Sequence, residues 1–304
     1  MRSLVTDGMD AGAVQALRDL GHEVVEQFYA PEELGKALRD FDACVVRSKT
    51  KVRANHIDEA LGGKLKLIIR GGVGVDNIDV AYAESKGIAV RNTPAASSES
   101  VAELAMGHMF ACARYISIAG STMREDRWEK KAYGKGIELQ GKTLGIIGFG
   151  RIGQHLGVMA KAIGMKVVAF DIFHIPGIEE QLGIHYVEMD ELLAESDFIS
   201  VHAPAVDGGA IINADTIAKM KDGVCIINTS RGANLDEDAL LAALESGKVR
   251  AAGLDVYASE PAQNKALYSH PMVSCTPHIG ASTVEAQKRI GQEIVDIITK
   301  QFDL

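Results

Sequence analysis

The segment Lys142-Thr-Leu-Gly-Ile-Ile-Gly-Phe-Gly-Arg-Ile-Gly153 decides the fold of this chain. Its apolar run at residues 144–147 predicts a strand, and the spacing of apolar residues at 152–163 predicts a helix directly after it. Between them stands the pattern Gly148-x-Gly150-x-x-Gly153. The first glycine permits a tight turn, the second lets backbone N–H groups approach an anion, and the third lets the helix pack closely on the strand. A pyrophosphate would then lie at the N-terminus of the helix.

A second strand, predicted at residues 166–171, ends in the acid Asp171. An acid about 20 residues after such glycines is placed to hydrogen-bond the ribose hydroxyls of a dinucleotide. Its carboxylate would repel a 2′-phosphate, and Ile172, Phe173 and His174 supply no Lys or Arg to neutralise one. The sequence therefore predicts a dinucleotide site and favours NAD over NADP.

Strand-like and helix-like segments alternate along the whole chain. Further strands are predicted at residues 24–25, 43–46, 67–69, 88–90, 198–202, 224–229 and 252–256. A long helical stretch from residue 97 to 124 separates two sheet-forming regions, and a last helix is expected at 282–302, where it would dock on the first region. This alternation predicts an α/β chain with two doubly wound parallel-sheet domains.

Composition and charge exclude several classes of protein. With 304 residues, 47% of them hydrophobic and 24% charged, the chain is typical of a globular protein of about two domains. Its formal net charge of −9 argues against nucleic acid as a partner. The N-terminus lacks the pattern of a signal peptide, and no apolar stretch reaches the length of a membrane span. We expect a cytoplasmic protein that binds neither nucleic acid nor membrane.

The four cysteines are widely scattered and form no C-x-x-C pair. Three of them stand in apolar runs, where a free cysteine acts as a small core residue. We therefore expect no disulfide, catalytic thiol or metal site from Cys44, Cys112, Cys225 and Cys275.

Three polar residues follow strand-like runs in the second half of the chain: Arg231, Glu260 and His278. The carboxyl ends of strands are where open α/β sheets bind ligands. A guanidinium can hold a carboxylate, and an imidazole can take or return the proton of a hydroxyl. A carboxylate beside that imidazole orients it and favours its protonated form. The trio therefore suits hydride transfer at a 2-hydroxy acid, although isolated residues of these types often only cap or face solvent.

Four ordered motifs resemble those of the D-isomer-specific 2-hydroxyacid dehydrogenases. They are the glycine motif with Asp171, Asn228-Thr-Ser-Arg-Gly232, Gly253-Leu-Asp-Val-Tyr-x-x-Glu-Pro261 and Thr276-Pro-His-Ile-Gly-Ala281. The resemblance implies that Arg231 binds substrate, that His278 is the acid/base and that Glu260 pairs with it. It also implies a Rossmann-type NAD domain (92–281) inserted in a flavodoxin-like substrate domain (1–91 and 282–304). Subunits would join through the NAD domain into a homodimer, with a tetramer as the alternative. The implied cofactor contacts are Gly148, Gly150, Arg151, Ile152, Gly153, Asp171, His202, Ala203, Pro204, Thr229, Ser230, Arg231, Asp255, His278, Gly280 and Ala281.

A basic cluster in the first domain suggests a substrate with a second anionic group. Arg47, Lys49, Lys51 and Arg53 alternate along what would be an extended segment, so they are predicted to share a face. With residues 70–79 and 126–131, the cluster resembles the D-3-phosphoglycerate dehydrogenases of the family. The resemblance implies oxidation of D-3-phosphoglycerate at C2, the entry to serine biosynthesis. The implied substrate contacts are Arg47, Arg70, Val73, Gly74, Arg231, His278 and, from a neighbouring subunit, Lys130 with Lys131.

Two alternatives stay open. A reductase of hydroxypyruvate, glyoxylate or another 2-keto acid would use the same trio, and a solvated basic edge would explain the cluster equally well. An NAD-sensing binding protein resembling the corepressors that share this fold is the more distant alternative. We also expect a short form without a C-terminal regulatory domain, and the loop at residues 206–210 lacks the threonine-bearing pattern of relatives.

Overall fold

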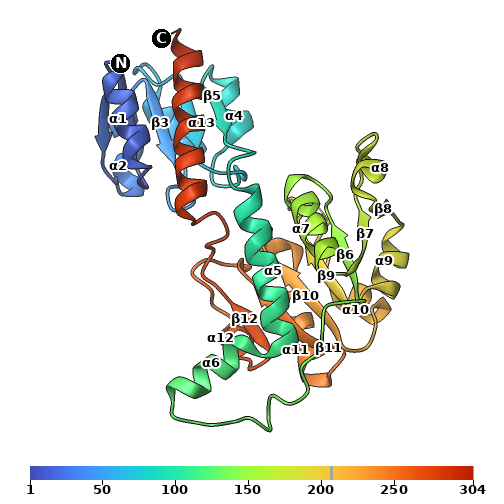
Figure 1. Ribbon diagram of the computed structural model, residues 1–304. Coiled ribbons are helices and arrows are strands. Elements are labelled where there is room, and N and C mark those ends of the chain that lie inside the picture. Colours follow the sequence, from blue (N-terminus) through green and yellow to red (C-terminus); the bar gives the residue numbers. More distant parts are fainter. Residues whose placement is uncertain (206–207, 304) are drawn as a thin grey trace. The chain divides into compact units, whose positions relative to one another are not determined.

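The structure is a computed structural model that describes residues 1–205 and 208–303 (Figure 1). The chain forms two compact units. Unit 1 consists of Met1–Ser98 and Ala281–Leu304, and unit 2 of Glu99–Gly280. Each unit is built on a parallel sheet, which confirms the predicted α/β class.

The sheet of unit 1 has five parallel strands in the order β2-β1-β3-β4-β5, which is the flavodoxin-like order. The strands are β1 (Arg2–Val5), β2 (Glu23–Glu26), β3 (Ala43–Val46), β4 (Leu67–Arg70) and β5 (Ala89–Asn92). The helices are α1 (Ala11–Asp19), α2 (Pro31–Leu38), α3 (Ala54–Ala60), α4 (Val80–Ser85) and α13 (Val284–Phe302). The central strand β3 is buried along its whole length, as expected where helices cover both faces of a sheet.

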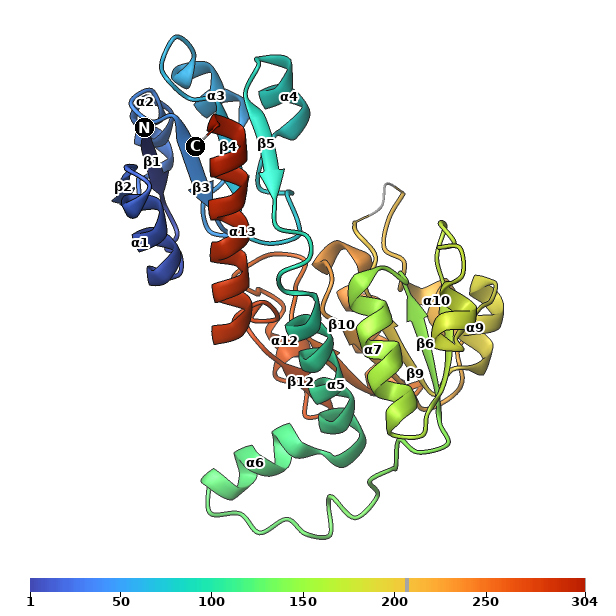
Figure 2. The ribbon, with the colours of Figure 1, turned by 45° about the horizontal axis from the view of Figure 1, so that its top comes forward.

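The C-terminal helix α13 lies beside α1, as Figure 2 shows. A Cβ atom added at Gly291 would lie 2.6 Å from the Cβ of Ala13, so the glycine permits this close approach. Ile290, Ile294 and Ile298 recur every fourth residue and are buried on the side of α13 that faces the core. The last helix is therefore an integral part of unit 1.

The sheet of unit 2 has seven parallel strands in the order β12-β11-β10-β9-β6-β7-β8. Numbered from β6, this is the Rossmann strand order with one additional edge strand. The strands are β6 (Thr143–Ile147), β7 (Lys166–Phe170), β8 (His185–Tyr186), β9 (Phe198–Val201), β10 (Val224–Asn228), β11 (Val249–Leu254) and β12 (Val273–Cys275).

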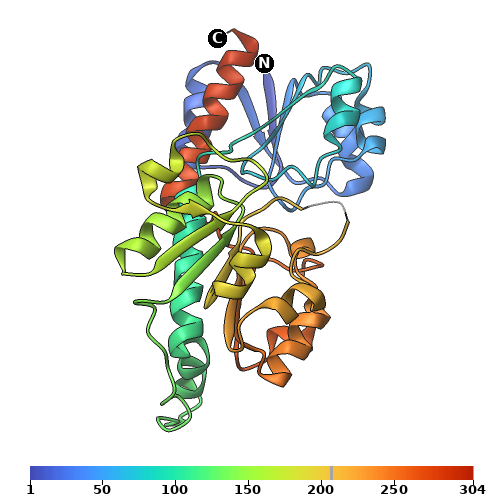
Figure 3. The ribbon, with the colours of Figure 1, turned by 90° about the vertical axis from the view of Figure 1, so that its right-hand side faces the viewer.

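Helices cover both faces of this sheet, as Figure 3 shows. Successive residues of a strand point to opposite faces. Cys225 and Ile227 accordingly belong to the core under α5, α7 and α8, whereas Val224 and Ile226 belong to the core under α9 to α12. The helical elements are α5 (Ser98–Arg114), α6 (Ile116–Arg124), α7 (Arg151–Ala162), α8 (Ile178–Leu182), α9 (Met189–Glu195), α10 (Ala214–Lys219), the 3-10 helix η1 (Gly232–Asn234), α11 (Glu237–Ser246) and α12 (Lys265–Tyr268).

Two details of unit 2 differ from the sequence prediction. The helical stretch expected at 97–124 is divided into α5 and α6 by Tyr115, whose φ of 58° is left-handed. The short edge strands β8 and β12 were not predicted, because two or three residues show no usable periodicity. Among the residues that the structure describes, no helix is both long and apolar enough to cross a membrane.

Candidate active site

Three glycines shape the turn between β6 and α7. Gly148 has a left-handed φ of 93°, and a Cβ atom there would lie 2.5 Å from the backbone nitrogen of Ala203. A Cβ atom at Gly153 would collide with the carbonyl oxygen of Gly148. At Gly150, directly before α7, an added Cβ would meet no described atom within 4 Å. Two of the glycines therefore serve packing, and the third leaves the first turn of α7, with Arg151 and Ile152, open to a ligand.

Asp171 links the end of β7 to the glycine turn. Its Oδ2 accepts a hydrogen bond of 2.7 Å from the backbone N–H of Phe149, and its Oδ1 accepts one of 3.0 Å from that of Phe173. These contacts fix the carboxylate at the strand end where a ribose is expected. Its contact with the ribose stays a prediction.

The loop after β10 presents Arg231. The buried side chain of Asn228 accepts from the backbone N–H and the hydroxyl of Ser230, and donates to the carbonyl oxygen of Arg231 at 2.9 Å. The Arg231 guanidinium donates to the Ser230 carbonyl oxygen at 2.7 Å. Because Gly232 packs against the carbonyl of Tyr257, the loop is held against the segment after β11. The side chain of Asn228 therefore holds the backbone of residues 230 and 231 in place.

Glu260 and His278 form a direct pair. The His278 Nδ1 and Glu260 Oε2 atoms are 2.7 Å apart, and both side chains are about one-third exposed. The Glu260–Pro261 peptide bond is cis, and His278 has a left-handed φ of 54°. Burial opposes the charge of Glu260, but the hydrogen bond and charge of His278 and the charge of Arg231 lower the pKa of this carboxyl below its usual value. The ionised carboxylate accepts from Nδ1–H and leaves Nε2 of the imidazole available to a reactant.

Two buried polar atoms at the carboxyl ends of β9 and β10 have no hydrogen-bond partner among the described residues. They are Nδ1 of His202 and Oγ1 of Thr229. The other ring nitrogen of His202 lies 2.8 Å from Oγ of Ser200, and burial lowers the pKa of His202 to about 3, so the ring is neutral. Buried polar atoms are normally paired, so these two mark places where a ligand could complete the hydrogen bonding. They lie in the predicted cofactor segments at 202–204 and 229–231.

The basic cluster of unit 1 does not lie on one continuous extended segment, the premise from which a shared face was predicted. None of residues 47–51 belongs to a strand, and Ser48 and Lys49 form a bend at which Asp7 accepts from the backbone N–H groups of Arg47 and Thr50. The Lys49 ammonium lies 4.0 Å from the centre of the Phe28 ring. The guanidinium of Arg53 pairs with Asp79 at 2.8 Å. Two of the four cations are therefore engaged with other side chains.

The other predicted substrate contacts lie in two places. Arg70, Val73 and Gly74 are in unit 1, at the end of β4 and in the loop that follows. The Val73 carbonyl oxygen accepts from the side chain of Asn92 at 2.6 Å. Lys130 is exposed in unit 2, two residues after Trp128, whose surface is 78% exposed. Ala281, a predicted cofactor contact, belongs to unit 1. In the loop at 206–210, residues 206 and 207 lie outside the described part of the chain.

Comparison with known proteins agrees with the motifs. The sequence model of the "D-isomer specific 2-hydroxyacid dehydrogenase, NAD binding domain" matches residues 106–280. The chain belongs to this family. It is 50% identical to a hydroxypyruvate reductase of Thermotoga maritima, over 99% of this chain and 98% of that protein. It is 45% identical to a D-3-phosphoglycerate dehydrogenase of Methanocaldococcus jannaschii, of which it spans 57%.

Solved structures support the same family. The TT0316 protein of Thermus thermophilus superimposes with a TM-score of 0.88 at 33% identity, over 97% of this chain and 94% of that one. A glyoxylate reductase of Paecilomyes thermophila gives a TM-score of 0.86, also at 33% identity, over 98% of this chain and 94% of that one. The predicted family, the enzyme class and the NAD cofactor are thereby confirmed.

This dehydrogenase has residues suited to hold NAD. Four features lie at the carboxyl ends of neighbouring strands of one sheet. They are the open space beside Gly150, the carboxylate of Asp171, and the buried atoms of His202 and Thr229 that have no partner among the described residues. The pyrophosphate would face the N-terminus of α7, and the ribose would face Asp171.

Sequence reasoning did not identify the side chains that hold residues 276–280, the turn that carries His278 (the His278 turn). Asp255, predicted as a cofactor contact, accepts three hydrogen bonds from the protein. His108 of α5 contacts Ser274 in β12 and Thr276 directly after it. The sequence signal for His108 is a histidine within the apolar stretch at residues 104–113. Its partners are 166 and 168 residues away in the chain, so no local pattern could identify them.

Proposed function

We propose that this dehydrogenase interconverts D-glycerate and hydroxypyruvate with NAD. The chemistry rests on the contact of 2.7 Å between Glu260 and His278, in the same unit as Arg231. NAD, when bound, accepts the hydride from C2 of the hydroxy acid.

In the oxidation, His278 Nε2 takes the proton of the C2 hydroxyl as the C2–H bond yields its hydride and the carbonyl forms. Glu260 holds Nδ1–H of the ring and stabilises the imidazolium that results. Arg231 binds the carboxylate of the substrate through paired N–H donors. In the reduction, His278 returns the proton to the carbonyl oxygen.

The choice of hydroxypyruvate rests on two observations. The chain is 50% identical to the hydroxypyruvate reductase of T. maritima, against 45% for the phosphoglycerate dehydrogenase of M. jannaschii. The basic cluster also offers fewer available cations than its sequence suggests, since Lys49 and Arg53 are engaged.

D-3-phosphoglycerate, the substrate first inferred from sequence, remains the second candidate. Arg47 supports it, because its backbone is fixed by Asp7 and by Asn77. Its guanidinium forms no ion pair within the described residues. A phosphate on C3 could bind there, and oxidation would then serve the entry to serine biosynthesis.

Comparing kcat/KM for D-glycerate, D-3-phosphoglycerate and D-lactate separates the candidates. We expect D-glycerate to be preferred, and we expect Arg47→Ala and the control Lys49→Ala each to change its kcat/KM less than threefold. A preference of about tenfold or more for D-3-phosphoglycerate, lost in Arg47→Ala and kept in Lys49→Ala, would establish the second candidate instead; loss of a charged hydrogen bond accounts for that size of effect.

Replacing Glu260 with Gln should shift the pH dependence of oxidation. Because the lowered pKa keeps Glu260 ionised, its charge favours protonated His278, and oxidation needs the neutral ring. The neutral amide removes that preference, so the pH of half-maximal kcat/KM should fall. The measurement is a pH–rate profile from pH 5 to 9. An unmoved profile would show that Glu260 does not tune the base.

A homodimer and a cytoplasmic location, both expected from the sequence, are part of the proposal. The exposed apolar side chains of Ile116, Met123 and Trp128 on and after α6 are consistent with a subunit contact there.

A further inference from the structure

A continuous series of side-chain hydrogen bonds runs through unit 2 behind the His278 turn. We call it the relay, and it consists of Ser117, Ser274, His108, Thr276 and Asp255. The Ser117 and Ser274 hydroxyls are 2.8 Å apart, and Ser274 Oγ lies 3.0 Å from Nδ1 of His108. Nε2 of His108 lies 3.1 Å from Oγ1 of Thr276, which donates to Oδ1 of Asp255 at 2.6 Å.

The Asp255 carboxylate fixes the direction of every bond in the relay. Its two oxygens already accept from the backbone N–H groups of Ile279 and Gly280, each at 2.8 Å. Since the Thr276 hydroxyl gives its proton to Asp255, its oxygen accepts from Nε2–H of His108. The neutral ring then accepts at Nδ1 from Ser274, whose oxygen accepts from Ser117. The donors therefore all point toward Asp255.

His108 suits this role because it is buried and tightly packed. Only 3% of its surface is exposed, and a Cβ atom at Gly253 of β11 would lie 2.5 Å from the Cβ of His108. The glycine thus lets α5 approach the sheet at the histidine. Burial lowers the pKa of His108 despite the charge of Asp255, so the ring is neutral and offers one donor and one acceptor.

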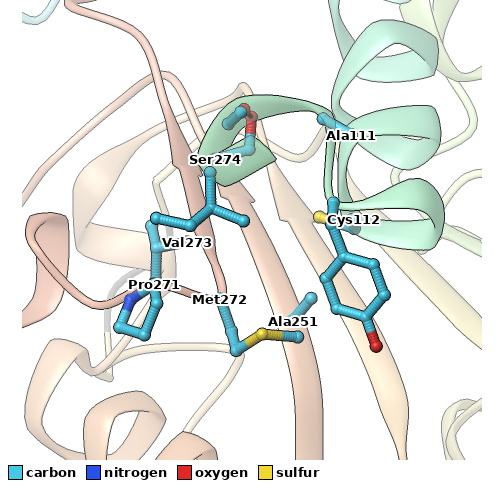
Figure 4. A pocket seen from close by; sticks show the side chains of 10 residues that line it. Ala111, Cys112, Ala251, Pro271, Met272, Val273 and Ser274 are labelled. Atoms are coloured by element: carbon cyan, nitrogen blue, oxygen red, sulfur yellow. Dashed lines mark hydrogen bonds between the residues drawn. The ribbon is translucent and has the colours of Figure 1, made fainter. Parts of the chain in front are cut away.

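The relay connects a small pocket to the catalytic turn. Ser117 and Ser274 line a pocket of about 10 Å³, whose other walls include Cys112, Ala251 and Met272 (Figure 4). At the other end, Asp255 binds the two residues that directly follow His278, whose φ of 54° is unfavourable for a residue with a side chain. Such a conformation persists only where its surroundings impose it.

We propose that His108 is a positioning residue that holds the His278 turn in its reactive geometry through Thr276 and Asp255. The inference rests on the proposed role of His278. A ring that donates to Thr276 Oγ1 keeps this hydroxyl directed at Asp255, and Asp255 in turn fixes the backbone on the C-terminal side of His278. Without the ring, Thr276 can rotate away and the turn loses one of its supports.

Three substitutions test this inference in the full-length enzyme. His108→Leu removes both hydrogen bonds, whereas His108→Gln keeps an N–H donor near the position of Nε2. His22→Leu is the matched control, because His22 is similarly buried, at 5% exposed, and neither of its ring nitrogens has a partner among the described residues. The readouts are kcat and KM for reduction of hydroxypyruvate, and hydrogen exchange at the amides of Ile279 and Gly280, followed by mass spectrometry.

We expect His108→Leu to lower kcat about tenfold or more with little change in KM, since small misplacements of a catalytic group cost that much. The exchange of the two amides should quicken in the same variant. His108→Gln should restore most of kcat and of the protection, and His22→Leu should alter neither. Equal losses in the Leu and Gln variants, or unchanged exchange in folded His108→Leu, would overturn the inference. The exchange readout needs no turnover, so it is independent of whether hydroxypyruvate is the substrate.

Discussion

Replacing His278 with Asn should lower kcat for both directions of the reaction by about 10²- to 10⁴-fold, the usual contribution of a general acid/base. Asn suits the site because it tolerates the left-handed conformation that His278 adopts, with φ of 54°. It keeps a polar group near Glu260 but offers nothing at the position of Nε2 that could take a proton. The loss should therefore lie in the chemical step.

The measurement is steady-state kinetics together with the Kd for NADH, from fluorescence titration. NADH affinity should change less than threefold, and His185→Asn, at a site where 78% of the side chain is exposed, should behave like the wild type. A His278→Asn enzyme that retains kcat within threefold of the wild type would exclude His278 as the base.

Replacing Arg231 with Gln should lower kcat/KM by about 10²- to 10³-fold, because two charge-assisted hydrogen bonds to the substrate carboxylate would be lost. Arg231→Lys should recover only part of this, since an ammonium cannot bind a carboxylate through two parallel bonds. The loop itself should persist, because Asn228 holds the backbone carbonyl oxygen of Arg231 and not its side chain.

The measurement is kcat/KM for hydroxypyruvate in the three enzymes, with Arg18→Gln as a control in which an exposed ion pair with Glu26 is removed. A Lys variant as active as the wild type would show that bidentate binding is not used. A Gln variant with normal kcat/KM would remove Arg231 from the site altogether.

Much of the fold could be predicted because its signals are local. The glycine motif, the short apolar runs of the buried strands and the helical spacing of apolar residues in α13 can each be recognised within a short stretch of sequence. The edge strands β8 and β12 are too short to show one. The break at Tyr115 was not predicted, because a left-handed residue other than glycine carries no reliable sequence signal.

The candidate site could likewise be predicted only where its signals are local. Arg231 and Glu260 could be found because each follows a predicted strand within a motif, and His278 because it stands in the motif at residues 276–281. The bend within the basic cluster was not predicted, because the Asp7 side chain that holds it lies 40 residues earlier in the chain than Arg47. The relay through His108 could not be predicted from the sequence, because its contacts exist only after α5 has packed on β11 and β12. Contacts between distant segments need the tertiary structure.

The most direct test of the central claim is isotope transfer from D-[2-²H]glycerate to NAD, followed by mass spectrometry of the reduced cofactor. If the chain is a D-2-hydroxyacid dehydrogenase of this substrate, the reduced cofactor gains a single deuterium from the D isomer, and none from L-[2-²H]glycerate or from D₂O. A reduced cofactor without deuterium, or equal transfer from the L isomer, would contradict the account.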